Sequence, residues 1–214
     1  MPTSWCPPGH LLEARLAAGP GAETWLGRRR TDGATVVLKR LLAPAPGARE
    51  RLRRDAAVVA ALVDPHLLAP YDVQSTDSGD VVVLRQHLAG EALPDVLRRR
   101  ARLAPPEVVT LLVPLARVVA ALHQRGMVHG RIAAGNVLFR PDGRPVLTDV
   151  GAAVAAGDVD ADSATPAADV VALAALGLRA LGGPEPDPTP AGPAPAAVPA
   201  ATEPAASMGA GLLA

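Results

Sequence analysis

The sequence has few aromatic side chains: phenylalanine, tyrosine and tryptophan together make up 2% of its 214 residues. Hydrophobic residues still account for 49% of the chain, so a core is expected, and alanine, valine and leucine must build it. A chain of this length is expected to form one domain or one two-lobed unit. The shortage of aromatic rings also disfavours nucleic-acid binding, because single strands are held largely by base stacking on such rings.

Cysteine and net charge are equally scarce. Cys6 is the only cysteine, which excludes a disulfide within the chain and a cysteine-rich zinc site. The formal net charge is +0, so no overall field attracts nucleic acid or an anionic membrane. We therefore interpret the arginine runs 28–30 and 98–100 as solvated faces, and we expect no nucleic-acid partner.

No segment is predicted to span a membrane. The apolar stretch 108–122 is interrupted by Pro114 and Arg117 and is too short to cross a bilayer. The first residues lack the basic region and the apolar core of a signal peptide. These absences favour a cytoplasmic location.

Hydrophobic periodicity predicts an α+β fold. In the first half of the chain a helical pattern predicts a helix at 48–63. Alternating apolar residues bounded by turn residues predict strands at 10–17, 23–29, 34–41, 67–73 and 81–88. Asp32-Gly33 is a strong hairpin signal between the second and third of these strands.

The second half is predicted to be mainly helical. Helices are expected at 94–100, 106–124 and 167–181. The segment 184–214 is rich in proline and alanine and contains no lysine or arginine. Such a composition cannot bury enough apolar surface to offset the entropy of ordering, so we expect a disordered tail.

Two polar side chains, Asn136 and Asp149, lie thirteen positions apart in this second half. Asn136 ends the segment HGRIAAGN, which begins at His129, and Asp149 begins the segment DVG. Amide and carboxylate oxygens are suitable ligands for a hard cation such as Mg²⁺. In register, the two segments resemble the H-R-D-x-x-x-x-N loop and the D-F-G turn of protein kinases.

The resemblance implies a degenerate and C-terminally truncated member of the bacterial Ser/Thr protein kinase-like family. It implies a two-lobed domain at 8–183, with a five-stranded, one-helix small lobe at about 8–88 and a partial, mainly helical large lobe at about 89–183. Asn136 and Asp149 would then hold Mg²⁺ and, with it, the phosphates of ATP.

Arg131 falls where this family has its catalytic aspartate. A guanidinium has no acceptor and stays protonated, so it cannot take a proton from a substrate hydroxyl. No intact catalytic residue is therefore expected. Loss of a positioned general base typically lowers a rate by about 10²–10⁴-fold.

Three further residues match cofactor-binding positions of the family. Lys39 is the only lysine of the chain and ends Val-Val-Leu-Lys, which resembles the family's V-A-I-K strand. Asp55 lies on the inner face of the next helix, where the family has a glutamate that pairs with this lysine, but it is one methylene shorter. Gly19 is the glycine that remains in place in a degraded phosphate-covering loop, where Pro20 removes a backbone donor.

Arg85 is expected where the family places the residue at the back of the adenine pocket. A buried unpaired cation is costly, so Arg85 must find a partner or point to solvent. If it folds inward, it closes the pocket to nucleotide.

Three functions remain open at this point. The first is a pseudokinase with a regulatory or scaffolding role and weak binding of ATP and Mg²⁺. The second is a Ser/Thr protein kinase of low activity, since phosphoryl transfer depends mainly on positioning and charge. The third is a nucleotide-free protein-interaction module.

The helix at 167–181 suggests how such a protein would find partners. It is apolar on all sides, and the helices that cover it in the family are missing from the pattern. We therefore expect self-association or a protein partner at this helix, because exposed apolar patches usually mark interfaces.

Overall fold

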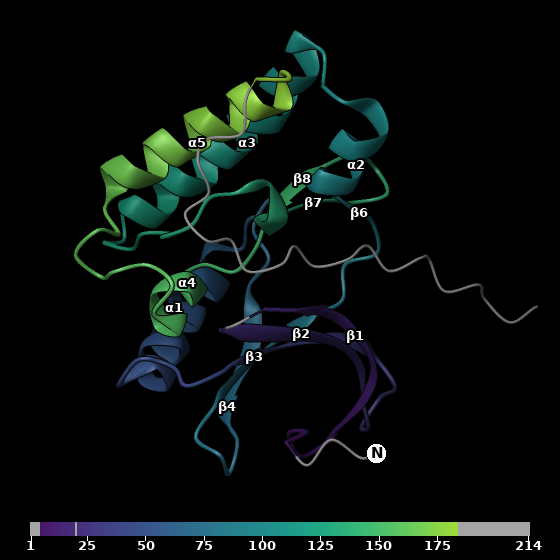
Figure 1. Cartoon of the computed structure of the whole chain (residues 1–214), viewed down its shortest axis with the longest axis vertical. Coiled ribbons are helices and arrows are strands. Elements are labelled where there is room, and N and C mark those ends of the chain that lie inside the picture. Colours follow the sequence, from purple (N-terminus) through teal and green to yellow (C-terminus); the bar gives the residue numbers. More distant parts are fainter. Residues whose placement is uncertain (1–4, 20, 184–214) are drawn as a thin grey trace, which may run out of the picture.

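The described part of the chain, residues 5–19 and 21–183, folds into two lobes in the computed structural model (Figure 1). A twisted sheet with one long helix forms the first lobe, and paired helices dominate the second. This arrangement confirms the predicted two-lobed α+β fold. The predicted disordered tail lies outside the described residues.

The small lobe is one antiparallel sheet of five strands in the order β1-β2-β3-β5-β4, with helix α1 against it. The elements are β1 His10–Ala18, β2 Ala22–Arg29, β3 Thr35–Leu41, α1 Ala48–Leu62, β4 Pro70–Ser75 and β5 Val81–Gln86. The turn after β2 contains Gly33 at a φ of 71°, a left-handed conformation that glycine adopts without strain. The predicted five strands and single helix are therefore confirmed.

The two faces of this sheet carry separate apolar clusters, as the period of two along a strand requires. One cluster packs against α1 and includes Leu41, Val83 and Leu52. The other lies on the opposite face, where Trp5 covers Val36 and its neighbours. The ring of Trp5 meets that of Trp25 edge to face, with centroids 5.9 Å apart.

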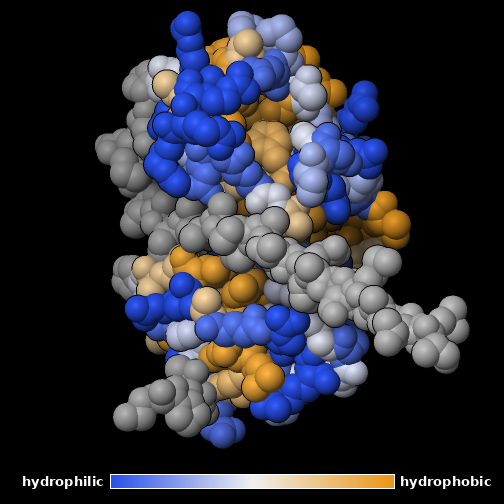
Figure 2. Space-filling view, turned by 90° about the vertical axis from the view of Figure 1, so that its right-hand side faces the viewer, coloured by the Kyte–Doolittle hydropathy of each residue, from blue (hydrophilic) through white to orange (hydrophobic). Residues whose placement is uncertain are grey.

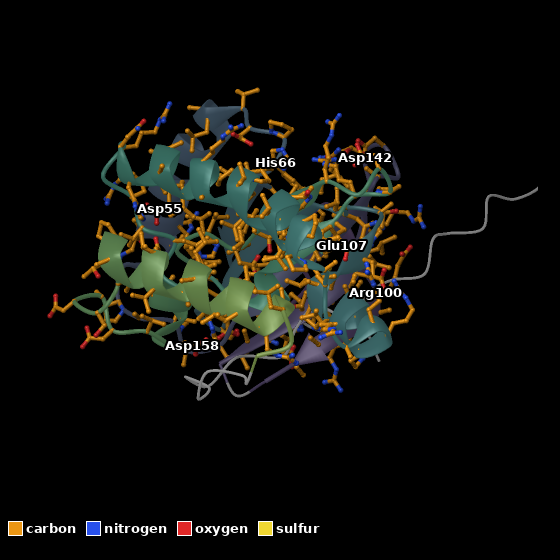
Figure 3. The ribbon with its side chains drawn as sticks, turned by 90° about the horizontal axis from the view of Figure 1, so that it is seen from above. Asp55, His66, Arg100, Glu107, Asp142 and Asp158 are labelled. Atoms are coloured by element: carbon orange, nitrogen blue, oxygen red, sulfur yellow. The ribbon has the colours of Figure 1, made fainter. Side chains whose placement is uncertain are left out.

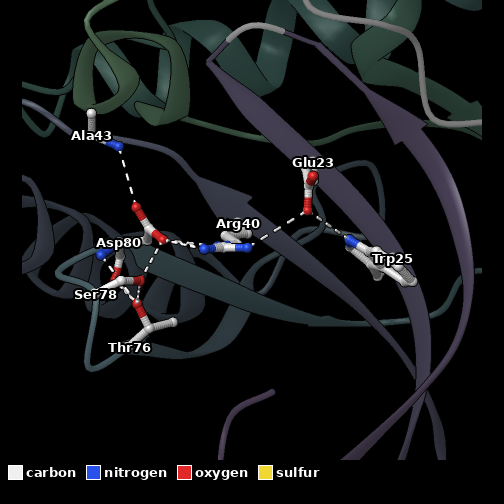
Figure 4. A network of polar contacts seen from close by, with 7 residues as sticks. All are labelled: Glu23, Trp25, Arg40, Ala43, Thr76, Ser78 and Asp80. Atoms are coloured by element: carbon white, nitrogen blue, oxygen red, sulfur yellow. Dashed lines mark hydrogen bonds and ion pairs between the residues drawn. The ribbon is translucent and has the colours of Figure 1, made fainter. Parts of the chain in front are cut away.

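A polar network joins β2 and β3 to the turn between β4 and β5 (Figure 4). Arg40 on β3 donates to Asp80 through Nη2 at 2.5 Å and lies 3.8 Å from Glu23 on β2. Asp80 also accepts a hydrogen bond from Ser78 Oγ at 2.7 Å, and Glu23 accepts one from Trp25 Nε1 at 3.1 Å. Each partner of Arg40 is thus held by a second contact.

The predicted strand at 67–73 is partly wrong, because β4 begins only at Pro70. Leu67 instead forms an isolated bridge with Leu147, and Leu68 N donates to the same residue's carbonyl at 2.9 Å. Leu67 is buried in the core cluster of the large lobe. Leu67, whose apolar side chain suggested a longer strand, therefore packs in the core of the large lobe.

The large lobe combines a three-stranded sheet, β6-β7-β8, with helices that cover it. Its elements are β6 Glu91–Ala92, α2 Leu93–Arg100, α3 Pro105–His123, the 3₁₀ turn η1 Ala134–Asn136, β7 Val137–Phe139, β8 Pro145–Leu147, α4 Ala152–Ala156 and α5 Pro166–Ala180. Helices α3 and α5 lie side by side (Figures 1 and 3). The three predicted helices of this half are confirmed to within one or two residues.

The prediction that the stretch 108–122 is too short to cross a bilayer is wrong for the helix that contains it, because α3 is, by length and composition alone, long and apolar enough to do so. The core helix of a folded domain passes the same test. In this structure the apolar face of α3 is buried in the large-lobe core, through Val108, Leu111, Leu115, Val118, Val119 and Leu122. Its place in the fold is that of a core helix.

Helix α5 approaches α3 closely at Gly177. A Cβ at this glycine would lie 2.6 Å from Leu112 Cδ1, so a larger residue would force Leu112 to move. Leu176 and Ala180 are buried on the same side of α5. Its other side remains exposed and carries Val170, Val171 and Leu178.

The second arginine run lies on α2 and is neutralised locally. Figure 2 looks onto the side of the molecule that carries α2, where hydrophilic side chains cover much of the large lobe. Arg98 pairs with Asp95, Arg99 with Glu91, and Arg100 with Glu107. Figure 3 shows the last pair, which joins α2 to the first turn of α3. Such pairing suits a solvated face.

Candidate functional site

The loop that carries Arg131 is fixed from below by Asp169, a buried residue in the first turn of α5. Its two carboxylate oxygens accept hydrogen bonds from the backbone N–H groups of His129, at 2.7 Å, and Gly130, at 3.0 Å. Oδ2 also lies 2.9 Å from His123 Nε2 on α3. Two helices therefore set the position of this loop.

His129 is fully buried and holds the other side of the loop. Its Nε2 lies 3.0 Å from the carbonyl oxygen of Thr148, and its Nδ1 accepts from Arg131 N at 3.2 Å. A carbonyl only accepts and an amide only donates, so the neutral ring with its proton on Nε2 satisfies both contacts. Burial lowers the pKa of His129, while the negative charge of Asp169 partly opposes this. His129 therefore supports the backbone of the loop from within the core.

Arg131 and Asn136 occupy the two ends of the loop. Arg131 Nη1 lies 2.9 Å from Asp158 Oδ2, with both side chains largely buried. Asn136 Nδ2 donates to the carbonyl oxygen of Arg131 at 2.9 Å. The amide of Asn136 thus closes the loop, while the guanidinium stands where the family's base would stand.

Lys39 and Arg85 lie on the same face of the small-lobe sheet. Lys39 is opposite Val83, and Arg85 is opposite Val37, in the antiparallel register of β3 and β5. Opposite residues share a face and alternate residues return to it, so both cations face α1 and the DVG turn. They meet one carboxylate there, that of Asp149.

Asp149 is held between these two cations. Lys39 Nζ lies 2.6 Å from Asp149 Oδ2, and Arg85 Nε lies 3.8 Å from Oδ1. Burial alone would raise the pKa of Asp149, but the charges of Lys39 and Arg85 outweigh it and lower this pKa to about 2. The carboxylate is therefore ionised throughout the neutral range.

Arg85 itself is buried, with 6% of its surface exposed. Burial lowers the pKa of its guanidinium, and the charge of Asp149 opposes that shift. Within the described part of the chain its Nε has no hydrogen-bond partner. Arg85 therefore folds inward and depends on Asp149 for its compensating charge.

The turn that presents Asp149 has unusual backbone geometry. Asp149 has a φ of 67° and Gly151 a φ of 70°, both in the left-handed region. Aspartate tolerates this region better than most residues, and glycine adopts it freely. A Cβ on Gly151 would also lie 2.8 Å from Asp55 Oδ2, so a larger residue would have to move Asp55, and this position favours glycine. Val150 between them is buried in the large-lobe core.

Two of the predicted cofactor-binding residues lie apart from this cluster. The expected pair between Lys39 and Asp55 is not formed, because Lys39 is bound to Asp149 and the carboxylate of Asp55 lies beside Gly151. The shorter aspartate and the packing of α4 against α1 account for this. Gly19 lies in the turn after β1, where its N–H donates to the Ala22 carbonyl at 2.9 Å. Neither Asp55 nor Gly19 lines the cavity beside Asp149.

That cavity has a volume of about 540 Å³ and lies between the two lobes. It brings together Lys39, Asn136, Asp149 and Arg131, as the sequence predicts for one site. Its charged lining consists of Lys39, Arg98, Arg131, Arg179, Asp149 and Asp158. Positive side chains therefore outnumber carboxylates around it.

The comparison with known proteins agrees with this geometry. A sequence profile for protein tyrosine and serine/threonine kinases matches residues 11–170. The chain belongs to the protein kinase family. It is 30% identical over 210 residues to the serine/threonine-protein kinase PknA of Mycobacterium tuberculosis, a match covering 83% of this chain and 47% of PknA. It is 29% identical over 150 residues to PknH of Mycobacterium bovis, covering 69% of this chain and 25% of that kinase. This chain thus spans about half the length of PknA, or less in the case of PknH.

Protein kinases use ATP with Mg²⁺, and they hold the metal with residues at the positions of Asn136 and Asp149. The arrangement of this kinase-family chain does not fit a divalent cation. Both oxygens of Asp149 face cations, and Asp158, the other carboxylate of the cavity, is paired with Arg131. Among the described residues, no cluster of three or more histidine, cysteine or acidic side chains could hold a metal.

Sequence reasoning missed Asp158, the residue that pairs with Arg131. Asp158 follows the short helix α4, and its Oδ1 would lie 3.0 Å from a Cβ on Gly21, so it also reaches the turn between β1 and β2. It belongs to no kinase motif. The one available signal is indirect: an arginine at the base position of this kinase-like loop needs an acidic partner nearby.

Proposed function

We propose that this chain is a pseudokinase, a kinase domain that regulates or scaffolds other proteins and does not transfer phosphate efficiently. The observation that carries the proposal is the ion pair between Arg131 and Asp158. The position of the general base is filled by a cation, and that cation is already bound to the nearest carboxylate. Neither group is then suited to accept a proton from a hydroxyl.

The intact support of the loop strengthens this interpretation. Asp169, His129 and Asn136 hold the loop backbone through five hydrogen bonds of 2.7–3.2 Å. The loop is therefore well ordered, and its defect is the chemistry of one side chain. A kinase fold that keeps the support of this loop but lacks the general base is suited to binding without phosphate transfer.

We further propose that the cavity beside Lys39 binds nucleotide weakly. Lys39 lines that cavity. Arg85 folds inward but is not part of the lining, so it does not close this cavity as the sequence led us to expect. The low aromatic content and the paired arginine runs support a role without nucleic acid. We place this role in the cytoplasm.

Phosphate transfer decides between a pseudokinase and a weak kinase. With radiolabelled ATP and a generic basic protein, the unmodified chain should give only background transfer. The double variant Arg131→Asp with Asp158→Ala should exceed that background by about tenfold or more, since a positioned base is worth about 10²–10⁴-fold. Asp158 is removed as well because, once Arg131 is replaced, its unpaired carboxylate would face the carboxylate introduced at position 131.

Asp158→Ala alone is the matched control and should stay at background. Robust transfer by the unmodified chain, abolished by Lys39→Ala, would overturn the proposal and establish a low-activity kinase.

A further inference from the structure

The buried charges around Asp149 do not balance. Lys39 and Arg85 approach its two oxygens from two adjacent strands, at 2.6 Å and 3.8 Å. One carboxylate thus faces two fixed cations, and the cluster carries an excess positive charge. A buried cation is costly unless a counter-charge accompanies it, so Asp149 is held in place by Arg85 as well as by Lys39.

A divalent cation at Asp149 would enter a site that is already positive. It would have to displace Lys39 from Oδ2 and leave Arg85 buried without its counter-charge. Asp158 offers no alternative, because its carboxylate is paired with Arg131. Unlike charges attract strongly at such distances in a buried site, and like charges repel as strongly.

A bound anion, in contrast to a cation, would be attracted by the positive side chains around the cavity. The charged lining of the cavity consists of four cations, Lys39, Arg98, Arg131 and Arg179, and two carboxylates, Asp149 and Asp158. Arg98 is paired with Asp95 outside the lining and Arg131 with Asp158 within it, so the excess of positive charge at the cavity is modest. Residues 86–88, at the end of β5 and just after it, are not part of the lining. The cavity is therefore better suited to a chain of phosphates than to the adenine base of a nucleotide.

We infer that this cleft binds a polyphosphate group without a divalent metal. Lys39 supplies positive charge at the cavity wall, and Arg85, which is buried and does not line the cavity, neutralises Asp149 from behind, so that a metal ion is not needed there as it is in active kinases. The inference rests on the nucleotide binding proposed above and specifies its chemistry. In it, Asp149 is a counter-ion for Arg85 and has no role as a metal ligand.

The test measures binding of ATP and of inorganic tripolyphosphate by calorimetry, in EDTA and in millimolar Mg²⁺. The Kd of ATP in EDTA should lie within about twofold of that in Mg²⁺, and tripolyphosphate should compete with ATP. Tightening by Mg²⁺ of about tenfold or more would overturn the inference. A failure of tripolyphosphate to compete would also overturn it, as would the absence of ATP binding in both buffers.

Variants of Arg85 and Asp149 test whether these two charges make ATP binding independent of Mg²⁺. Arg85→Met replaces a buried cation by an apolar side chain of similar length, and it should make ATP binding depend on Mg²⁺ by about tenfold. Arg40→Met is the control: it removes an ion-paired arginine from the opposite face of the same sheet (Figure 4) and should leave binding independent of the metal.

The comparison of EDTA with Mg²⁺ in the unmodified chain keeps the test decisive if Arg85→Met does not fold. Asp149→Asn adds to it once circular dichroism shows that the variant folds with Arg85 left uncompensated. If Asp149 is a counter-ion, loss of its negative charge should leave ATP binding unchanged or tighten it. If Asp149 is a metal ligand, the variant should bind ATP more weakly in Mg²⁺, and that result would overturn the inference. Failure of the inference is distinct from failure of the pseudokinase proposal, which phosphate transfer alone would overturn.

Discussion

His129 shows how a single residue can serve the loop without taking part in chemistry. It is fully buried, and its two ring nitrogens contact the Thr148 carbonyl and the Arg131 N–H. Both contacts need the neutral ring, because a protonated Nδ1 would face the N–H of Arg131 with another proton. The stability of the loop therefore depends on the protonation of this ring.

The first prediction concerns pH. Because burial lowers the pKa of His129 from the usual 6.5, the unfolded chain takes up a proton that the folded chain does not. This contribution to the free energy of unfolding is complete above pH 6.5 and declines as the pH falls below it. The slope due to His129 cannot exceed about 1.4 kcal/mol per pH unit.

Urea unfolding between pH 7.5 and 5 provides the measurement. The decline should be shallower in His129→Gln than in the unmodified chain, since glutamine does not titrate. Near-ultraviolet circular dichroism at pH 7.5 should first establish that the variant keeps native packing. Equal slopes in the two proteins would contradict the prediction.

At the residue scale, the sequence identified which residues belong to the candidate site, but it did not predict which of their charged side chains form ion pairs. The spacing of HGRIAAGN and DVG placed Arg131, Asn136 and Asp149 beside one cavity with Lys39. It did not reveal that Lys39 pairs with Asp149 and leaves Asp55 beside Gly151. Such pairing depends on ångström-scale placement of α1 and α4, which no local pattern encodes.

At the scale of elements, long periodic segments were predicted well and short ones were not. Helices α3 and α5 begin one residue before their predicted starts, and α1 ends one residue before its predicted end, where Val63 takes a φ of 44°. Helix α4 has five residues and was not predicted. Helix α4 packs against α1, and this contact is needed because a stretch of five residues is too short to form a stable helix alone in water, even though alanine is a strong helix former.

The second prediction concerns the start of α5, which presents Asp169 to the loop. Thr165 is the N-cap, and its Oγ1 accepts a hydrogen bond from Ala168 N at 3.1 Å. Thr165→Ala should lower the free energy of unfolding by about 0.5–2 kcal/mol, the usual effect of losing such a cap. Chemical denaturation measures the difference.

Thr110→Ala is the control for this change. Thr110 is an exposed threonine inside α3 whose hydroxyl donates back to the Pro106 carbonyl, so it caps nothing. Alanine is the better helix former, and the variant should be neutral or slightly stabilised. A loss of stability as large as that of Thr165→Ala would contradict the role assigned to the cap.

At the scale of the whole molecule, the neighbouring helices α3 and α5 of the large lobe leave an apolar surface. We call it the α3–α5 surface; its exposed large side chains are Val109, Val113, Val170, Val171, Leu178 and Leu181. The sequence predicted exposure along the whole of α5, but Leu176 is buried against the core, so the exposed set is smaller. Exposed apolar side chains gathered on neighbouring helices are typical of an interface.

The third prediction is therefore that the chain self-associates through the α3–α5 surface. Analytical ultracentrifugation of the unmodified chain should show a dimer or larger species whose fraction rises with concentration. The double variant Val171→Glu with Leu178→Glu should shift the chain to monomer, because pairing two copies would bury four carboxylates without partners.

Val63→Glu separates this effect from a general gain in solubility. Val63 is the most exposed of the large hydrophobic residues in the described chain, at 86%, and lies after α1 in the small lobe. Its substitution adds a charge away from the α3–α5 surface and should leave the sedimentation profile unchanged. A monomer at all concentrations of the unmodified chain, or dissociation by Val63→Glu to the same extent, would show that the α3–α5 surface does not bring copies together.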